Sequence, residues 1–282
     1  MHSNGKLWAA VFALVAIACS VAYWWGPAHD MWLPPDHSTY GIKTDNLFNM
    51  ILAITSVAFV GVQIALCSFM WKYGNDGSRA RGTFVHGNHQ LEVAWTVIPA
   101  AILVLIAVVQ WSTWLEIKRP ANFPEKVAKQ VEEKRPFAEV LAGQFEWRIT
   151  YPRHPGSEGP DGKIGARDDV HVLNNFHVPQ GEYILIHLRS RDVLHSFYLP
   201  NFRLKQDAVP GMTIPVWFMA KGPKEGDATC PPDKDSVRFD LMCAELCGWG
   251  HYKMKGALTV HRDRASFDKW LDEAKKAEEA TQ

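Results

Sequence analysis

The sequence has no excess of charge of either sign. Its 282 residues include 30 Lys and Arg and 30 Asp and Glu, so the formal net charge at pH 7 is zero. Domains that bind nucleic acid carry a clear excess of basic side chains, usually gathered on one face. The balanced charge therefore argues against a nucleic-acid partner, and we expect none.

Cysteine is also scarce, with five residues in the whole chain. Secreted folds framed by disulfides carry even numbers of cysteines, so an odd count of five does not predict such a fold. Cys19 and Cys67 lie within apolar runs, where a small buried hydrophobic residue is the ordinary interpretation. Cys230 stands alone in a Thr-Cys-Pro-Pro segment with no evident role. Only Cys243 and Cys247 form a close pair.

Charge is missing altogether from three long apolar stretches in the first 115 residues. About 20 apolar residues are needed to span the hydrocarbon core of a bilayer, and buried soluble helices of that length without a polar face are rare. We predict a transmembrane helical hairpin within residues 40–116, formed by the second and third stretches. The stretches are Leu7–Trp25, Leu47–Trp71 and Val93–Leu115.

The connection between the second and third stretches carries Lys72, Arg79 and Arg81 against Asp76. Cytoplasmic loops of membrane proteins carry an excess of Lys and Arg, so we place this connection in the cytoplasm. The third stretch then runs outward, and the chain after Glu116 lies on the outer side. We therefore expect a multi-pass protein of the bacterial inner membrane, in contact with membrane lipid, with its C-terminal domain in the periplasm.

The first stretch, within residues 1–25, has two interpretations. It is long enough to be an additional transmembrane helix. It also has Lys6 before an apolar centre and an Ala16-Ile17-Ala18 segment, which is typical of a signal peptide and its cleavage site. Ala16 to Cys19 faintly resembles a lipoprotein processing site as well. We favour a retained helix or an uncleaved signal and leave cleavage open.

Glu92 stands immediately before the third stretch. A carboxylate at a helix start complements the helix dipole, and this is the ordinary interpretation. An ionisable group at the membrane edge can also feed a proton path. Pro99 predicts either a kink in this helix or a late start.

The outer region changes to short strand-like runs between turn signals. Pro120–Lys134 reads as a linker or short surface helix, and Arg153–Asp169 as a surface loop. Many short strands within about 130 residues predict a sandwich or barrel over residues 117–262, followed by a C-terminal helix and tail at 263–282. The fold class is thus membrane-anchored all-β. The expected strands are 138–151, 171–178, 183–188, 192–199, 213–220, 237–242 and 256–260.

Two thiols, an imidazole and a thioether lie within twelve positions: Cys243, Cys247, His251 and Met254. Soft sulfur and imidazole ligands favour copper, zinc or iron–sulfur centres. Blue-copper sites use the same ligand types but a single thiolate, so a second thiolate points to two bridged copper ions. Zinc pairs are usually spaced C-x₂-C and methionine is a poor zinc ligand, while a disulfide leaves His251 and Met254 unexplained.

A copper pair needs one more ligand from a distant strand. His195 is the candidate because it lies at the end of an apolar strand-like run. The residue pattern leaves three competitors open, namely His171, His177 and His187.

Several motifs resemble subunit II of the haem–copper terminal oxidases, in the cytochrome c oxidase branch. The copper signature of that family, C-S-E-x-C-G-x-x-H-x-x-M, is present at 243–254 with Ala244 in place of serine. The elements H-S-x-x-x-P and K-x-D-x-x-P-G occur at 195–200 and 205–211. Phe176–Pro179 and Leu91–Pro99 match two further segments. The resemblance covers about residues 40–272.

The resemblance implies a cupredoxin-like domain that carries the binuclear copper centre CuA. By position, Cys243 and Cys247 would bridge both coppers, His195 and Met254 would complete one ion, and His251 with the main-chain carbonyl of Glu245 would complete the other. The Glu245 carboxylate would reach a magnesium ion shared with subunit I. Glu92 would be the entrance of a proton path. Haem would be present only in the partner subunit. This chain would contain no catalytic residue.

The family segment G-x-Q-W-x-W, whose first tryptophan faces cytochrome c, is altered here. The chain has Phe145 at that position and Trp147 two residues later. The resemblance therefore predicts Phe145 or Trp147 as the point where electrons arrive. Ordinary strand packing is the alternative for both rings.

The expected function is that of the electron-accepting subunit of a proton-pumping cytochrome c oxidase. Its partners would be subunits I and III and a periplasmic donor such as cytochrome c. One alternative is the CuA subunit of a nitric oxide reductase. A copper-free quinol-oxidase subunit is disfavoured by the intact ligand set, a nitrous oxide reductase by the membrane hairpin, and a copper store by the two-thiolate site.

Overall fold

The computed structural model describes residues 5–26, 29, 31–74, 84–152, 169–221 and 236–280. These fall into two compact units, one of Met1–Leu33 and Asp45–Ser112 and one of Pro34–Thr44 and Thr113–Gln282. Three segments that the sequence singled out lie outside the described residues. They are the basic positions 79 and 81 with Asp76, nearly all of the loop 153–169, and Cys230.

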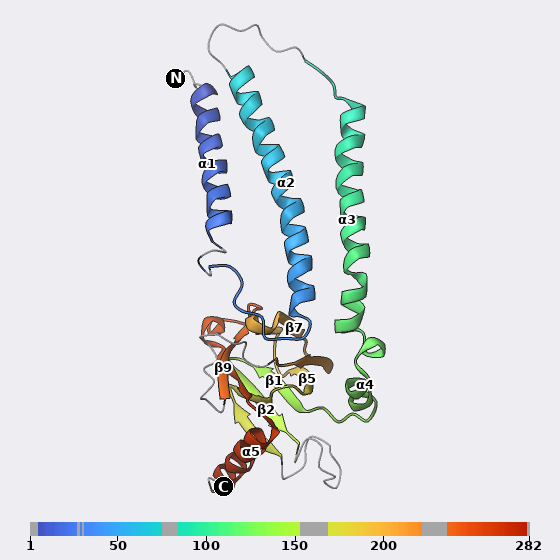
Figure 1. The fold of residues 1–282 in the computed structure, drawn as a ribbon, viewed down its shortest axis with the longest axis vertical. Coiled ribbons are helices and arrows are strands. Elements are labelled where there is room, and N and C mark those ends of the chain that lie inside the picture. The colour runs from blue at the N-terminus through green and yellow to red at the C-terminus, as the bar shows by residue number, and fades with distance from the viewer. Residues whose placement is uncertain are drawn as a thin grey trace. The chain divides into compact units, whose positions relative to one another are not determined.

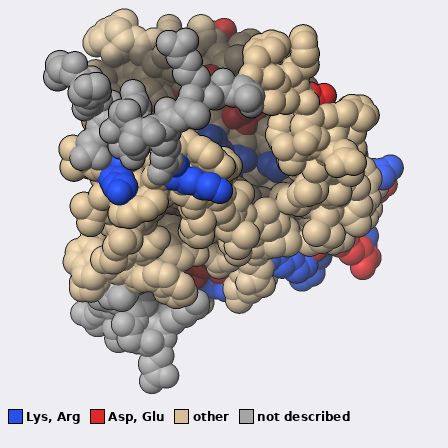
Figure 2. All heavy atoms as spheres, turned by 90° about the horizontal axis from the view of Figure 1, so that it is seen from above, with Lys and Arg blue, Asp and Glu red and all other residues tan. Residues whose placement is uncertain are grey.

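Three helices contain the apolar stretches: α1 (Gly5–Trp25), α2 (Gly41–Tyr73) and α3 (His89–Lys118) (Figure 1). All three are long and apolar enough to cross a membrane. No more than 6% of the most apolar window of any of them is buried within the protein. Uncharged side chains also make up most of the surface visible in Figure 2. Helices of this kind need a lipid or protein environment, which confirms the predicted membrane anchor.

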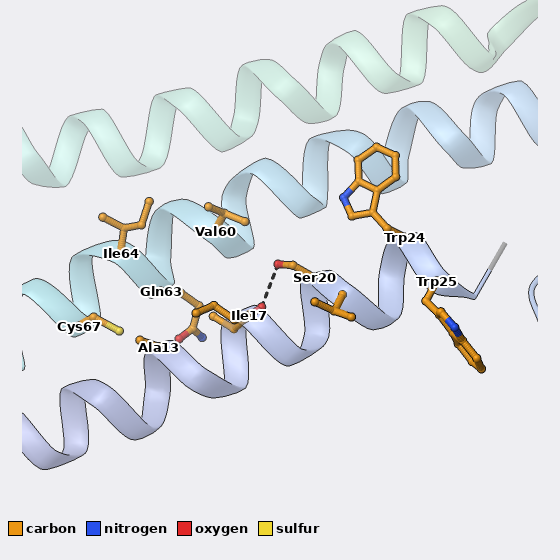
Figure 3. A pocket seen from close by; sticks show the side chains of 11 residues that line it. Ala13, Ile17, Ser20, Trp24, Trp25, Val60, Gln63, Ile64 and Cys67 are labelled. Carbon is orange, nitrogen blue, oxygen red and sulfur yellow. Dashed lines mark hydrogen bonds between the residues drawn. The ribbon is translucent and has the colours of Figure 1, made fainter. Parts of the chain in front are cut away.

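Helices α1 and α2 of the first unit pack against each other. Gly5 approaches Gly74 so closely that a Cβ on Gly5 would lie 2.5 Å from the Cα of Gly74. Further along, the two helices line a cavity of about 790 Å³ (Figure 3). Its lining is largely apolar, with Ser20 and Gln63 among the polar exceptions.

Helix α3 begins at His89, ten residues before Pro99, which excludes the late start and leaves the kink as the remaining alternative for Pro99. The Asn88 side chain explains this start, because its Oδ1 accepts the main-chain N–H groups of Gln90 and Leu91 at 3.1 and 3.2 Å. Such a cap satisfies groups that have no partner in the first turn. Glu92 lies in that first turn.

The second unit is a sandwich of two five-stranded sheets, as predicted. One sheet has the order β3-β2-β1-β5-β8 and the other β4-β10-β9-β6-β7. Short helices η2 (Pro120–Asn122) and α4 (Glu125–Glu132) precede it, in the segment predicted as a linker or surface helix. The strands are β1 (Ala138–Gly143), β2 (Glu146–Tyr151), β3 (Val170–Leu173), β4 (Asn175–Pro179), β5 (Tyr183–Ser190), β6 (His195–Leu199), β7 (Leu204–Ala208), β8 (Ile214–Met219), β9 (Ser236–Cys243) and β10 (Lys255–His261).

Two segments that were predicted as single strands each contain two strands in the structure. Residues 138–151 form the hairpin β1–β2, and 171–178 divide into β3 and β4 of different sheets. The second division lies at Asn174, which has a left-handed backbone (φ 55°). Its Oδ1 accepts the N–H of Trp147, and its own N–H donates to the Trp147 carbonyl, both at 2.8 Å. Asparagine tolerates this conformation better than most residues, so the chain changes sheets there. Strand β7 was missed because Lys205-Gln-Asp207 has no apolar alternation.

Aromatic side chains fill the space between the sheets. Trp147 meets Phe197 edge to face at a centroid distance of 5.6 Å, and both are fully buried. Helix α5 (Arg264–Glu279) buries Phe267 and Leu271, confirming the expected C-terminal helix. The segment Pro34–Thr44, which lies between α1 and most of α2, also belongs to this unit. Within it, the Tyr40 hydroxyl donates to the Trp217 carbonyl at 3.3 Å.

Candidate metal centre

Strand pairing brings together residues that are far apart in the sequence. Strands β6 and β9 are antiparallel neighbours, with Phe197 opposite Cys243. His195 begins β6 and Cys243 ends β9, and because these strands are antiparallel both residues lie at the same end of the sheet. The turn from β9 to β10 carries the remaining members of the motif. We call residues 244–254 the ligand loop.

Three potential ligand atoms lie within 4.8 Å of one another, from His195, Cys243 and Cys247. The Cys243 Sγ is 3.9 Å from the Cys247 Sγ and 3.9 Å from the His195 Nδ1. Both cysteines are free, and a disulfide would require about 2.05 Å between the sulfurs. The separation instead suits sulfurs that share a metal, since a zinc–thiolate bond, for comparison, is about 2.3 Å.

The rest of the motif surrounds the same two sulfurs. The Cys247 Sγ is 3.6 Å from the His251 Nδ1 and 3.8 Å from the Met254 Sδ. The Cys243 Sγ is 3.3 Å from the Glu245 carbonyl oxygen. Each sulfur therefore has two further donor atoms beside it, while the Glu245 side chain is exposed.

Asp192 holds the His195 ring in place. Its Oδ1 is 2.7 Å from the His195 Nε2, which leaves Nδ1 facing the Cys243 sulfur. Asp192 is itself held by the main-chain N–H groups of Gln144 and Val193, each at 2.7 Å. A carboxylate on the far nitrogen is the usual way in which a ligating histidine is oriented. Asp192 was not among the residues predicted from the sequence, although it lies only three residues before His195.

The two thiols differ in their protonation. Burial acts to raise the pKa of Cys243, but hydrogen bonds from His195 and from main-chain groups outweigh it and lower that pKa to about 6. Burial and the charge on Cys243 raise the pKa of Cys247 to about 11. Two adjacent thiolates repel each other, so a cation is needed for both to ionise. The donor set thus fits a soft metal ion, and the thioether favours copper over zinc.

The competing histidines lie elsewhere. His171 is exposed on β3, where its Nδ1 is 3.1 Å from the Thr150 hydroxyl. His177 is buried, with its Nδ1 2.8 Å from the His261 Nε2. His187 lies on β5 of the opposite sheet. Of these four candidate histidines, all of them described in the structure, His195 alone joins the two cysteines in a metal-binding group.

Phe145 and Trp147 have different environments. Trp147 is fully buried, and its ring lies 6.3 Å from the His195 ring in an edge-on contact. Phe145 is half-buried beneath Trp249, at 5.2 Å and 69°. Trp249 lies on the ligand loop and is 80% exposed. Trp249 was not among the predicted functional residues, although it lies within the copper motif at 243–254.

Comparison with known proteins gives a consistent family. Residues 22–112 match the transmembrane domain of cytochrome c oxidase subunit II, and residues 160–260 match its periplasmic domain. The cytochrome c oxidase subunit 2 of Thermostichus vulcanus is 26% identical over 93% of this chain and 84% of its own. The alternative cytochrome c oxidase subunit 2 of Bradyrhizobium diazoefficiens is 27% identical over 95% and 91%.

Among solved structures, the periplasmic domain of subunit II from Bradyrhizobium japonicum is 24% identical. It covers 50% of this chain and 94% of its own, with a TM-score of 0.39. The family assignment rests instead on the two matched domains, which together cover most of the chain in the expected order. The chain belongs to the cytochrome c oxidase subunit II family.

Proposed function

We propose that this chain is the electron-accepting subunit of a cytochrome c oxidase. It would accept electrons from cytochrome c at a binuclear CuA centre. It would pass them to haem in subunit I, where oxygen is reduced to water and protons are pumped. The observation that carries the proposal is the convergence of His195, Cys243 and Cys247 on one point of a membrane-anchored β-sandwich.

The ligand roles are those that the family resemblance implies, and the short distances among the six donor groups support them. Cys243 and Cys247 would bridge two copper ions. His195 and Met254 would complete one ion, and His251 and the Glu245 carbonyl the other. When bound, the copper pair supplies a one-electron redox couple. The chain contributes fixed geometry: Met254, Cys247 and His195 are 1%, 3% and 0% exposed, which limits water and movement at the ligands.

Two further roles are proposed. The exposed Glu245 carboxylate would bind a magnesium ion shared with subunit I, directly beside a ligand of the copper pair. Glu92, in the first turn of α3, would receive protons on the cytoplasmic side for the partner subunit. Subunit III would complete the membrane complex.

The alternative of a nitric oxide reductase uses the same centre with another partner subunit. The membrane anchor and the ligand set are compatible with it. Purification of the native complex with its partner, followed by identification of the haem types and of the gas consumed, separates the two functions.

The proposal is tested on the full-length chain loaded with copper in detergent. Metal analysis should find two coppers per chain. Electron paramagnetic resonance should show one unpaired electron shared equally by both. Cys247→Ser should abolish the sharing, while Ser266→Ala, a change in α5, should leave it intact. A signal from one isolated copper in the unmodified chain would contradict the proposal.

A further inference from the structure

We propose that Trp249 and Tyr252, with Phe145 beneath, form the docking face for the electron donor, and that Trp249 is its contact residue. We call these three side chains the aromatic face. The inference rests on the proposed function, because it assumes that a redox protein delivers electrons to the metal centre. The occupant is a small soluble c-type cytochrome, which would present its exposed haem edge to these rings.

The exposure of this loop is the first argument. Trp249 is 80% exposed and Tyr252 is 65% exposed, although large aromatic side chains normally bury most of their surface. Trp249 lies between the ligand-loop residues Cys247 and His251, and Tyr252 directly follows His251. Exposed tryptophan and tyrosine are the residues that most often anchor protein partners. A partner seated here would lie against the same short loop that holds the metal.

The packing beneath Trp249 is the second argument. The Phe145 ring contacts Trp249 edge to face, and it also fills the space beside Gly250, where an added Cβ would lie 2.5 Å from the ring. The neighbouring Gln144 side chain donates to the Cys247 carbonyl. The β1–β2 turn therefore supports the ligand loop from below. Phe145 is half-buried under Trp249, so the outer ring and not Phe145 meets the partner.

The charges near the aromatic face are mixed. The Lys253 Nζ lies 6.0 Å from the Trp249 ring and 5.5 Å from the Tyr252 ring. Nearby, Glu146 pairs with Arg148 at 2.6 Å and with Arg191 at 3.9 Å. No single sign dominates among these groups, so contact is mainly apolar and its salt dependence should be weak. Small, weak interfaces of this kind are typical of electron-transfer encounters.

The step itself moves one electron and no atoms. The haem iron of the docked cytochrome would be oxidised from Fe(II) to Fe(III), and the copper pair held by the two cysteines would accept that electron. No proton or bond is exchanged.

The first experiment measures binding alone. Full-length chain in nanodiscs, without copper, is titrated with oxidised mitochondrial cytochrome c by calorimetry. Trp249→Ala should weaken binding about tenfold or more, as for an anchor residue. Trp249→Phe should retain most of the affinity. The matched control is Leu173→Ala, since Leu173 is 57% exposed on β3 and lies outside the ligand loop.

The second experiment measures electron transfer in the purified oxidase complex. Trp249→Ala should slow reduction of the copper centre by ferrocytochrome c at least tenfold. Reduction by a small ruthenium(II) amine complex and the copper resonance spectrum should stay unchanged. Equal cytochrome binding and reduction in Trp249→Ala and the unmodified protein would overturn the docking face. An unmodified complex that ferrocytochrome c cannot reduce would contradict the proposed function instead.

Discussion

Asp192 shows that the geometry of the metal centre depends on a side chain that is not a proposed ligand. It accepts from two main-chain N–H groups and bonds the far nitrogen of His195, so the ring cannot turn away from Cys243. Support of this kind contributes as much to metal affinity as some ligands do. Substitution of Asp192 therefore tests whether the orientation of His195 contributes to metal binding.

We expect Asp192→Ala to lower copper affinity by roughly 10- to 100-fold, because His195 loses its orienting partner. Asp192→Asn keeps an acceptor and should lose less. Affinity is measured by competition with a copper chelator. Asp240→Ala, an exposed acid on β9, is the matched control. Equal affinity in Asp192→Ala and Asp240→Ala would show that the ring is held by packing alone.

His177 predicts the pH dependence of stability. Its burial, with the neighbouring His261 and Arg238, lowers its pKa from 6.5 to about 3, and its ring stacks on Trp270 at 3.6 Å. The folded state therefore keeps His177 neutral while the unfolded chain binds a proton below pH 6.5. The contribution of His177 to the free energy of unfolding is therefore fully present above pH 6.5 and is lost as the pH falls toward 3.

The expected loss from His177 approaches about 1.4 kcal/mol per pH unit well below pH 6.5. Denaturant unfolding of the full-length chain between pH 7.5 and pH 5 measures it. His177→Gln removes the titrating group, so its free energy of unfolding should fall less steeply over the same range. If the free energy of unfolding falls equally with pH in the unmodified chain and in His177→Gln, groups other than His177 cause the loss.

At the scale of elements, α5 closes one end of the sandwich. Phe267 is fully buried, with ring contacts to Phe137 at 5.3 Å and Tyr151 at 6.0 Å. We expect Phe267→Ala to lower the free energy of unfolding by about 3–5 kcal/mol, because it leaves a cavity. Lys269→Ala, on the exposed side of the same helix, should change it little. Both are measured by denaturant unfolding, and equal losses would mean that α5 does not pack as described.

At the scale of the whole molecule, the proposed proton path links the membrane anchor to turnover. We expect Glu92→Ala to slow oxygen consumption by the purified complex at least about tenfold, as when a proton-transfer group is removed. Its copper content should not change. Gln90→Ala, in the same first turn, is the control. Unchanged turnover in Glu92→Ala would return the carboxylate to a helix-start role.

Helix α1 raises the question of processing. Its close contact with α2 at Gly5 and Gly74 and the buried Ala9 favour a helix that is kept in the mature protein. Intact-mass measurement of the chain purified from its native membrane should then include residues 1–25. A mature chain that begins after residue 18 would show that the stretch is a signal peptide.

Residue patterns predicted the membrane anchor, the β-rich outer region and four members of the metal motif. These signals are local, since a helix that spans a bilayer must be apolar along its own length and the motif lies within twelve positions. The residue pattern left four histidines open for the remaining ligand, and only the family resemblance implied His195. The tertiary structure places His195 beside the two cysteines. His195 and Cys243 are 48 residues apart, and the pairing of β6 with β9 brings them together. The same holds for Asp192 and for Trp249 over Phe145, because contacts between distant segments depend on strand order and register, which residue patterns do not specify.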